Sequence, residues 1–105
     1  MRTHPRNEIN KLERRRKNKD ILREKFLNSL EWKEQAMLAK DSTTRQSDLE
    51  TLSKSPNWNV RLLVAKNTNT RNETVVRLSG DDHEAVAKAA MESYTTRKAS
   101  GRRVS

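Results

Sequence analysis

The chain has 105 residues and no cysteine, which limits it to one domain and excludes disulfides, thiolate metal sites and cysteine nucleophiles. Its 23 basic and 14 acidic residues give a net charge of +9, and only 31% of its residues are hydrophobic. No apolar run of about 18 residues and no apolar signal-peptide core is present, so we expect no membrane association and a cytoplasmic location.

Charged and apolar residues are distributed unevenly along the chain. Residues 1–41 hold 12 basic and 7 acidic residues, residues 42–92 hold 7 of each, and residues 93–105 hold 4 basic residues and no acidic one. By contrast, 28 apolar residues lie between Ile21 and Tyr94, so a core can form only there. The ends should therefore be solvated.

This distribution predicts three segments. We expect a basic N-terminal arm, helical in part, over residues 1–19, and a helical-repeat domain over residues 20–94. Residues 95–105 should form a disordered basic tail, because they have too few apolar residues to join a core.

The strongest charge feature lies in a helix predicted from about Glu8 to Leu27. Five cations fall within six residues, and a sixth follows: Arg14, Arg15, Arg16, Lys17, Lys19 and Arg23. At this density, Lys and Arg attract phosphate by neutralising its charge and releasing counterions. We expect this segment to contact nucleic acid or another polyanion. The alternative is a solvated helix that only keeps the protein soluble.

The segment from Asp20 to Leu30 is predicted to cover the open end of the core. Its apolar residues lie on adjacent faces of one helix: Leu22, Phe26, Leu27 and Leu30. If this cover is incomplete, the exposed apolar face would be closed by a partner or by a second copy of the chain. A homodimer is therefore one of the alternatives.

A sequence repeat spans the middle of the chain. Ala39-Lys40-Asp41-Ser42 aligns with Ala65-Lys66-Asn67-Thr68, and Trp32 aligns with Trp58; we call the interval from Trp32 to Trp58 the repeat period. Thr44-Arg45 aligns with Thr70-Arg71 and then with Thr96-Arg97. Apolar character that recurs at a fixed period is expected when each unit packs on its neighbour in the same way.

Each unit is predicted to form two short helices. The first begins after Thr44 or Thr70, whose hydroxyl should accept from free amides of the first turn, and Ser47–Glu50 and Thr70–Glu73 fit capping boxes. Breaks fall at residues 55–57 and 80–82, and the second helix runs over about residues 58–66 or 83–93. No stretch shows the period of a half-buried strand. The predicted fold is all-α, a short right-handed helical repeat.

The run Val64-Ala65-Lys66-Asn67-Thr68-Asn69-Thr70, followed by Val75, Leu78 and Asp81, resembles the variant leucine-rich repeat, a HEAT-like α-solenoid. The resemblance covers about residues 30–92 and implies a binding scaffold. The family usually has proline after the loop threonine, where this chain has Arg45 and Arg71. Some members carry an iron–sulfur cluster in a cysteine-rich segment, which a chain without cysteine cannot hold.

Equal spacing of the Thr-Arg pairs would stack Arg45, Arg71 and Arg97 along one edge of the solenoid. Such a row could follow a phosphate backbone or an acidic protein surface. The alternative is that each threonine caps a helix and each arginine is solvated in the first turn.

Trp32 and Trp58 occupy equivalent positions, so they are expected to anchor the packing between helix pairs. Alternatively, they are exposed hot spots for a partner protein, because tryptophan is enriched at such sites. In that case Arg61, one turn after Trp58, would line the same partner-binding surface.

Catalysis has little support in the sequence. His83 lies beside Asp81, Asp82 and Glu84, but acidic residues are favoured at a helix N-terminus without any metal. There is no Gly-rich phosphate loop, nucleophile elbow or His-rich metal motif. We therefore predict no enzymatic activity, no cofactor and no metal site.

The sequence favours a non-enzymatic helical-repeat module that docks on a macromolecular partner, with its arm and tail touching nucleic acid or a nucleoprotein complex. The alternative is a protein–protein regulator or inhibitor, of a size that would suit a virus-encoded protein. In that case the solenoid face binds a host or regulatory protein, and the cations provide solubility and steering.

Overall fold

The computed structural model describes residues 18–99, and every regular element in this range is helical. The elements are a helix over residues 18–29, then α2 (Trp32–Lys40), α3 (Gln46–Leu52), α4 (Trp58–Lys66), α5 (Asn72–Leu78) and α6 (Glu84–Ala99). The described residues contain no strand, which confirms the all-α class for this part of the chain. Most of the predicted basic arm, residues 1–17, and residues 100–105 lie outside the described range.

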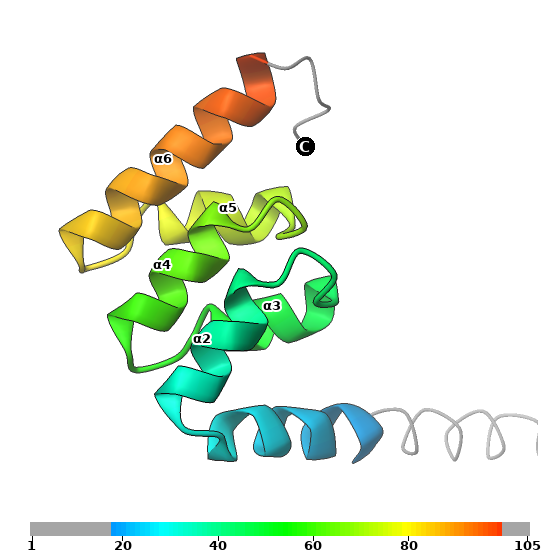
Figure 1. The fold of residues 1–105 in the computed structure, drawn as a ribbon. Helices are drawn as coiled ribbons and strands as arrows, with labels where there is room; N and C mark the ends of the chain where they lie inside the picture. The colour runs from blue at the N-terminus through cyan, green and yellow to red at the C-terminus, as the bar shows by residue number, and fades with distance from the viewer. Residues whose placement is uncertain (1–17, 100–105) are drawn as a thin grey trace, which may run out of the picture.

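The helices form two rows. Helices α2, α4 and α6 lie side by side, while α3 and α5 lie on one side of them (Figure 1). Helix α4 packs against both α2 and α6, and α5 packs against α6. The helix over residues 18–29 lies across the end of the stack next to α2, so the two ends of the described chain are at opposite ends of the stack (Figure 1).

The helix bounds recur at the repeat period. Helices α2 and α4 begin at the aligned residues Trp32 and Trp58, and α6 begins at Glu84, one further period along the chain. The N-caps of α3 and α5 have nearly the same backbone angles, with φ −63° and ψ 148° at Arg45 and φ −61° and ψ 147° at Arg71. The backbone therefore repeats in detail as well as in helix length.

The core runs through the stack from end to end. Twelve hydrophobic residues are buried: Leu27, Ala39, Leu49, Leu52, Val60, Val64, Ala65, Val75, Leu78, Val86, Ala89 and Ala90. Fully burying a Leu or Val side chain stabilises a protein by roughly 1.5–3 kcal/mol. Ala39 and Ala65 are equivalent and completely buried, and their small side chains let neighbouring helices approach closely.

Polar side chains connect one helix pair to the next. The Nδ2 of Asn67 donates to the carbonyl oxygens of Ala39 (2.8 Å) and Asp41 (2.9 Å). The Nδ2 of Asn69 donates to the carbonyl oxygen of Thr44 (2.6 Å). The carbonyls that follow α2 are thus satisfied by the loop that follows α4, as buried backbone groups require.

The loop threonines donate to the preceding helix, whereas they were predicted to accept from amides of the following one. Thr44 Oγ1 donates back to the carbonyl of Leu38 (2.6 Å), and Thr70 Oγ1 donates to that of Val64 (2.7 Å). Each hydroxyl therefore closes the end of the preceding helix, because the carbonyls of a last turn have no partner within the helix.

The predicted capping boxes are also wrong. The N-caps of α3 and α5 are Arg45 and Arg71, and neither side chain makes a capping hydrogen bond. The capping box of the described helices lies at α2, where Glu31 and Glu34 exchange hydrogen bonds.

The predicted C-terminal boundary of the repeat domain and the predicted cover of its other end need correction. Helix α6 continues to Ala99, so residues 95–99 are helical where a disordered tail was predicted. At the other end, Leu27 is buried, but Leu22 and Phe26 are 66% and 50% exposed. The helix over residues 18–29 therefore covers the core through Leu27 and leaves apolar side chains in solvent.

Replacing Asn67 with alanine should destabilise the fold by about 2–3 kcal/mol, because the buried carbonyl of Ala39 and the partly buried carbonyl of Asp41 would lose their donor. Urea unfolding followed by circular dichroism would measure this change. The matched control is Thr68→Ala, an exposed position in the same loop, which should change stability by less than about 0.5 kcal/mol. Equal stabilities of the two variants would show that these hydrogen bonds do not hold the helix pairs together.

Candidate functional site

The predicted polyanion-binding residues fall into three groups. Arg14, Arg15, Arg16 and Lys17 lie outside the described residues. Lys19 is exposed on the helix over residues 18–29. Arg23 is on the same helix but is paired with Asp48 of α3, with Nε 3.2 Å from Oδ1 and Nη2 2.8 Å from Oδ2. Its hydrogen bond to Asp48 raises the pKa of Arg23, so this cation is already engaged within the fold.

The structure separates the members of the Thr-Arg series. Arg45 and Arg71 are exposed at the N-termini of α3 and α5, with the same backbone geometry. Arg97 lies inside α6 and is only 6% exposed. The edge therefore presents two arginines to solvent, and the third points into the protein.

Arg97 seals the end of the stack. Its Nη1 donates to the carbonyl oxygen of Thr70 (2.7 Å) and to Oδ1 of Asn72 (2.8 Å), and its Nη2 donates to the carbonyl oxygen of Asn67 (3.0 Å). One repeat earlier, the equivalent carbonyls, those of Thr44 and Asp41, are bound by Asn69 and Asn67. Arg97 thus donates to the carbonyls of the last loop, as Asn67 and Asn69 donate to the equivalent carbonyls of the loop before it.

Trp32 and Trp58 are the first residues of α2 and α4 and are 44% and 38% exposed. Trp58 stacks on His83, with ring centroids 4.1 Å apart and an angle of 11° between the rings. Trp32 lines a depression together with Asn57, and Asn57 and His83 occupy equivalent positions one repeat period apart. Each tryptophan therefore lies beside the residue that precedes the next stacked helix, and both keep an exposed part.

The Arg61 side chain, predicted to line a partner-binding surface, is hydrogen-bonded within the protein. Its Nε and Nη2 bind the two carboxylate oxygens of Asp81 (2.8 and 3.1 Å), and its Nη1 binds the carbonyl of Ser55 (2.7 Å). Its side chain is 18% exposed. Arg61 therefore joins α4 to the segment that leads into α6.

The equivalent pair one repeat earlier is Gln35 and Ser55, joined by a hydrogen bond of 3.0 Å from Ser55 Oγ to Gln35 Oε1. The two partners have the same separation along the chain in both pairs, and each position is shifted by one repeat period between the pairs. This pairing was missed from the sequence, although its signal was there: a polar residue in the second turn and a partner just before the next helix.

Two partly buried acids have lowered pKa values. Burial would raise the pKa of Asp81, but hydrogen bonds from Arg61 and from the amide of His83 outweigh it and hold the carboxylate ionised. Burial would also raise the pKa of Glu50, and hydrogen bonds from Thr74 and Arg77 reverse that effect. Both acids join consecutive elements of the stack.

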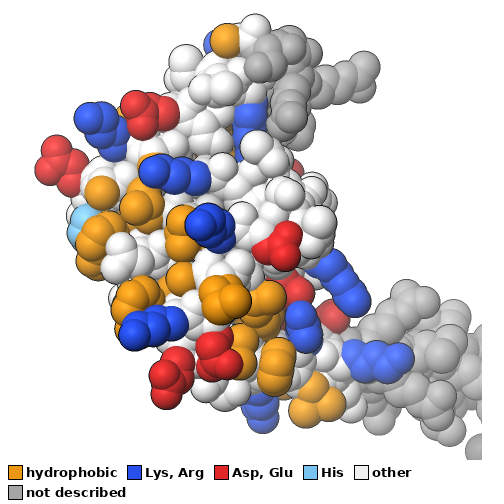
Figure 2. Space-filling view, in the orientation of Figure 1, with side chains coloured by type: hydrophobic (Ala, Val, Ile, Leu, Met, Phe, Trp, Pro, Cys, Tyr) orange, Lys and Arg blue, Asp and Glu red, His pale blue; other side chains and the backbone are white. Residues whose placement is uncertain are grey.

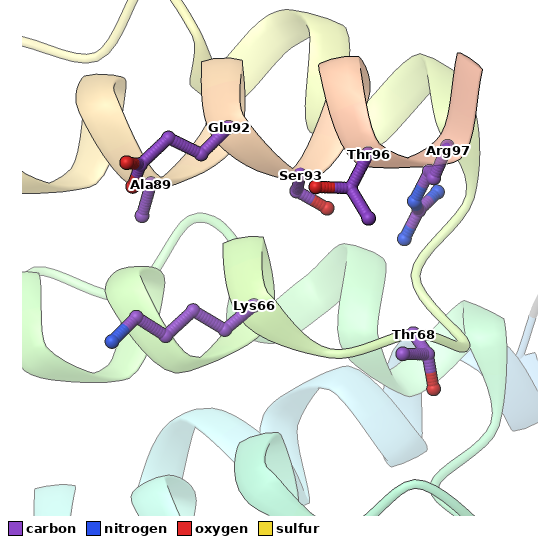
Figure 3. Close-up of a pocket in the computed structure, with 7 residues that line it drawn as sticks. All are labelled: Lys66, Thr68, Ala89, Glu92, Ser93, Thr96 and Arg97. Atoms are coloured by element: carbon purple, nitrogen blue, oxygen red, sulfur yellow. The ribbon is translucent and has the colours of Figure 1, made fainter. Parts of the chain in front are cut away.

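A cavity of about 280 Å³ opens between the C-terminal end of α4 and α6 (Figure 3). It is lined by Lys66, Thr68, Ala89, Glu92, Ser93, Thr96 and Arg97. The side chains of Lys66 and Glu92 extend toward one end of the groove, and Arg97 lies at the other end (Figure 3). A lining with a cation, a carboxylate and hydroxyls suits polar contacts with a partner. His83, the one histidine within the described range, is stacked on Trp58 and does not belong to this lining.

Residues 18–99 contain no cluster of three or more His, Cys, Asp or Glu side chains that could hold a metal ion. Over the same range, no helix has the length and apolar character needed to cross a membrane. Comparisons with protein families, curated proteins and solved structures gave no match.

Replacing Arg97 with alanine should lower the free energy of unfolding by about 3 kcal/mol, because buried carbonyls would lose charge-assisted hydrogen bonds. The adjacent Lys98→Ala variant is the control, since Lys98 is exposed, and it should unfold like the wild type. Chemical denaturation would give both values. A solvated, polyanion-binding Arg97 would instead leave stability unchanged in both variants.

Acid should destabilise the protein in part through Asp81. A carboxylate whose pKa is lowered by folding contributes stability above its unfolded pKa of about 4, and that contribution is lost as the pH falls through the folded value. Asp81→Asn should cost about 2 kcal/mol at pH 7 and should flatten the dependence of stability on pH below pH 5. The solvent-exposed Asp82→Asn variant should keep the wild-type profile when thermal unfolding is measured from pH 3 to pH 7.

Proposed function

We propose that the chain is a short right-handed α-solenoid of the variant leucine-rich repeat or HEAT-like kind, and that it works as a non-enzymatic docking module. The recurrence of helix bounds and cap geometry at the repeat period supports this proposal. So do the equivalent contacts that join successive helix pairs, Gln35–Ser55 and Arg61–Asp81. Solenoids of this kind provide extended surfaces to macromolecules.

The partner that we propose is nucleic acid or a nucleoprotein complex. The observation that carries this proposal is the pair of exposed, equivalent arginines, Arg45 and Arg71, which we call the basic edge. The cations in ion pairs of the described residues are Arg23, Lys54, Arg61 and Arg77, and none of them belongs to the basic edge. Two exposed guanidinium groups in repeated positions, neither of them in an ion pair within the described residues, suit contacts with phosphates.

The charge balance adds the two ends of the chain to this surface. Residues 18–99 hold 14 basic and 12 acidic residues, whereas residues 1–17 hold 7 and 2, and residues 100–105 hold 2 and none. Most of the excess positive charge therefore belongs to the N-terminal arm and the C-terminal tail. We propose that these ends supply the main electrostatic attraction and that the basic edge orients the folded domain.

A second candidate is a protein–protein regulator. The observation that favours it is the exposure of large apolar side chains on α2 and α4, which nucleic acid binding does not require. Affinity capture from cell extract with and without nuclease would separate the two functions, since a protein partner should survive the nuclease treatment. Loss of every partner after nuclease would remove this second candidate.

Binding to a fluorescent 30-nucleotide single-stranded RNA should weaken steeply with salt, because each phosphate contact adds about 0.7 to the slope of log K against log salt. Arg45→Ala/Arg71→Ala should lower that slope by about 1.4, and Arg14→Ala/Arg15→Ala/Arg16→Ala by about 2. Lys88→Ala, an exposed cation of α6, serves as the control. If both multiple variants bind the RNA as the wild type does, the nucleic-acid function is wrong.

A further inference from the structure

We infer that the outer surface of α2 and α4 is a docking site for an acidic amphipathic helix of a partner protein. The site is formed by Trp32, Met37 and Trp58 with Lys33, Lys40 and Lys66, and we call it the α2–α4 face. The inference rests on the protein-docking candidate above and names its partner class. It does not depend on the basic edge.

The two helices present the same stripe. In α2, Trp32, Ala36 and Lys40 follow at intervals of four residues, and in α4 Trp58, Leu62 and Lys66 do so. Residues four apart lie on one side of a helix. Since α2 and α4 pack side by side, the tryptophans lie at one end of both stripes and the lysines at the other.

Three large apolar side chains of the α2–α4 face are exposed to solvent. Met37 is 74% exposed, Trp32 44% and Trp58 38%. Figure 2 shows hydrophobic side chains gathered over α2 and α4, with Lys and Arg side chains between them and Asp or Glu side chains at the lower end. Exposed large apolar side chains with charged neighbours are typical of a site of protein interaction.

The charge of the face selects an acidic partner. Helix α4 contains no acidic residue, and its arginine is paired with Asp81. Helix α2 contains one acid, Glu34, which accepts a hydrogen bond from the backbone amide of Glu31 in the capping box. No ion pair within residues 18–99 involves Lys33, Lys40 or Lys66. None of the three lysines has a carboxylate partner in this range, and Lys33 Nζ lies over the Trp32 ring, 6.0 Å from its centre, so a helix with carboxylates beside its apolar stripe complements them.

Two cavities border the face. One of about 480 Å³ lies beside Trp32 and is lined in part by Leu30 and Pro56, which suits an apolar anchor residue. The other, between α4 and α6, has Lys66 in its lining and suits a polar one (Figure 3). Pockets that receive anchor side chains are typical of the centre of protein interfaces.

The same surface is less suited to nucleic acid. Bases stack on free aromatic rings, but one face of the Trp58 ring is already covered by His83 at 4.1 Å. The apolar side chain that is most exposed is Met37, whose thioether chain adapts to irregular protein surfaces and offers no stacking plane. The chemistry therefore favours an apolar helix over a nucleotide chain.

The inference can be tested with a display library of 16-residue helical peptides selected on the full-length chain. Enriched peptides should carry a net negative charge and apolar residues at i, i+3 or i+4, and i+7. Because both tryptophans of the chain lie in the α2–α4 face, binding of a selected peptide should change the intrinsic fluorescence. Met37→Glu should weaken that peptide at least tenfold. Lys33→Glu/Lys40→Glu/Lys66→Glu should do the same and should select basic peptides instead.

Lys25→Glu, an exposed charge reversal on another helix, is the matched control and should bind the acidic peptide as the wild type does. Circular dichroism and urea unfolding would verify that each variant keeps its helices. The inference is overturned if Met37→Glu binds the selected peptide with wild-type affinity, or if no acidic peptide is enriched. It also fails if single-stranded RNA alone changes the tryptophan fluorescence and loses this effect in the triple lysine variant.

Failure of this docking site and failure of the nucleic-acid function are distinguishable. Arg45→Ala/Arg71→Ala should keep full affinity for the acidic peptide, because these arginines lie at the N-termini of α3 and α5 and take no part in the α2–α4 face. Loss of peptide binding in that variant would contradict the separation of the two surfaces.

Discussion

The constraint on which the stack depends is that the carbonyl groups following α2 and α4 must find donors away from water. Asn67 and Asn69 provide them for the first of these loops, and Arg97 provides them for the second. Because each donor comes from the next repeat, the hydrogen bonds fix the spacing of the helix pairs at one repeat period. Hydrophobic burial alone is non-directional and would tolerate other offsets between the pairs.

Three arginines of the described residues take part in this packing, whereas Arg45 and Arg71 stay exposed. Arg23, Arg61 and Arg97 each form several directed hydrogen bonds, because a guanidinium is planar and has several donors. The lysines of α2 and α4 remain in solvent, since a flexible ammonium gains little from such sites.

The helices and their period could be predicted from the sequence. The difference between the exposed Arg45 and Arg71 and the buried Arg97 could not. All three follow a threonine at equal spacing, and only the course of the backbone distinguishes them. Asp41 and Asn67 end their helices by accepting the amides of Thr43 and Asn69. Ser93 occupies the equivalent position in α6, which continues to Ala99 and carries Arg97 into the protein. The distinguishing signal was thus four residues upstream of the arginine, in the absence of an Asp or Asn side chain to stop the helix.

Similarly, the exposure of Trp32 and Trp58 depends on which face of each helix meets its neighbour, which periodicity does not reveal.

The last helix pair also differs from the others in the side chains that it would present to a further repeat. Glu50 of α3 binds Thr74 and Arg77 of the next repeat, whereas the residue equivalent to Glu50 in α5 is Val76, which is 47% exposed and cannot accept a hydrogen bond. Ala65 is buried against its neighbour, while the equivalent Met91 is 56% exposed. A further unit of the same kind would therefore meet an apolar surface where it needs a carboxylate and a bulky side chain where it needs a small one. Arg97 also occupies the carbonyl oxygens of Asn67 and Thr70, so this end of the described stack differs from the contacts between successive helix pairs. The two sides of the stack differ in chemistry: the loop edge exposes arginines, and α2 and α4 expose tryptophan, methionine and lysine.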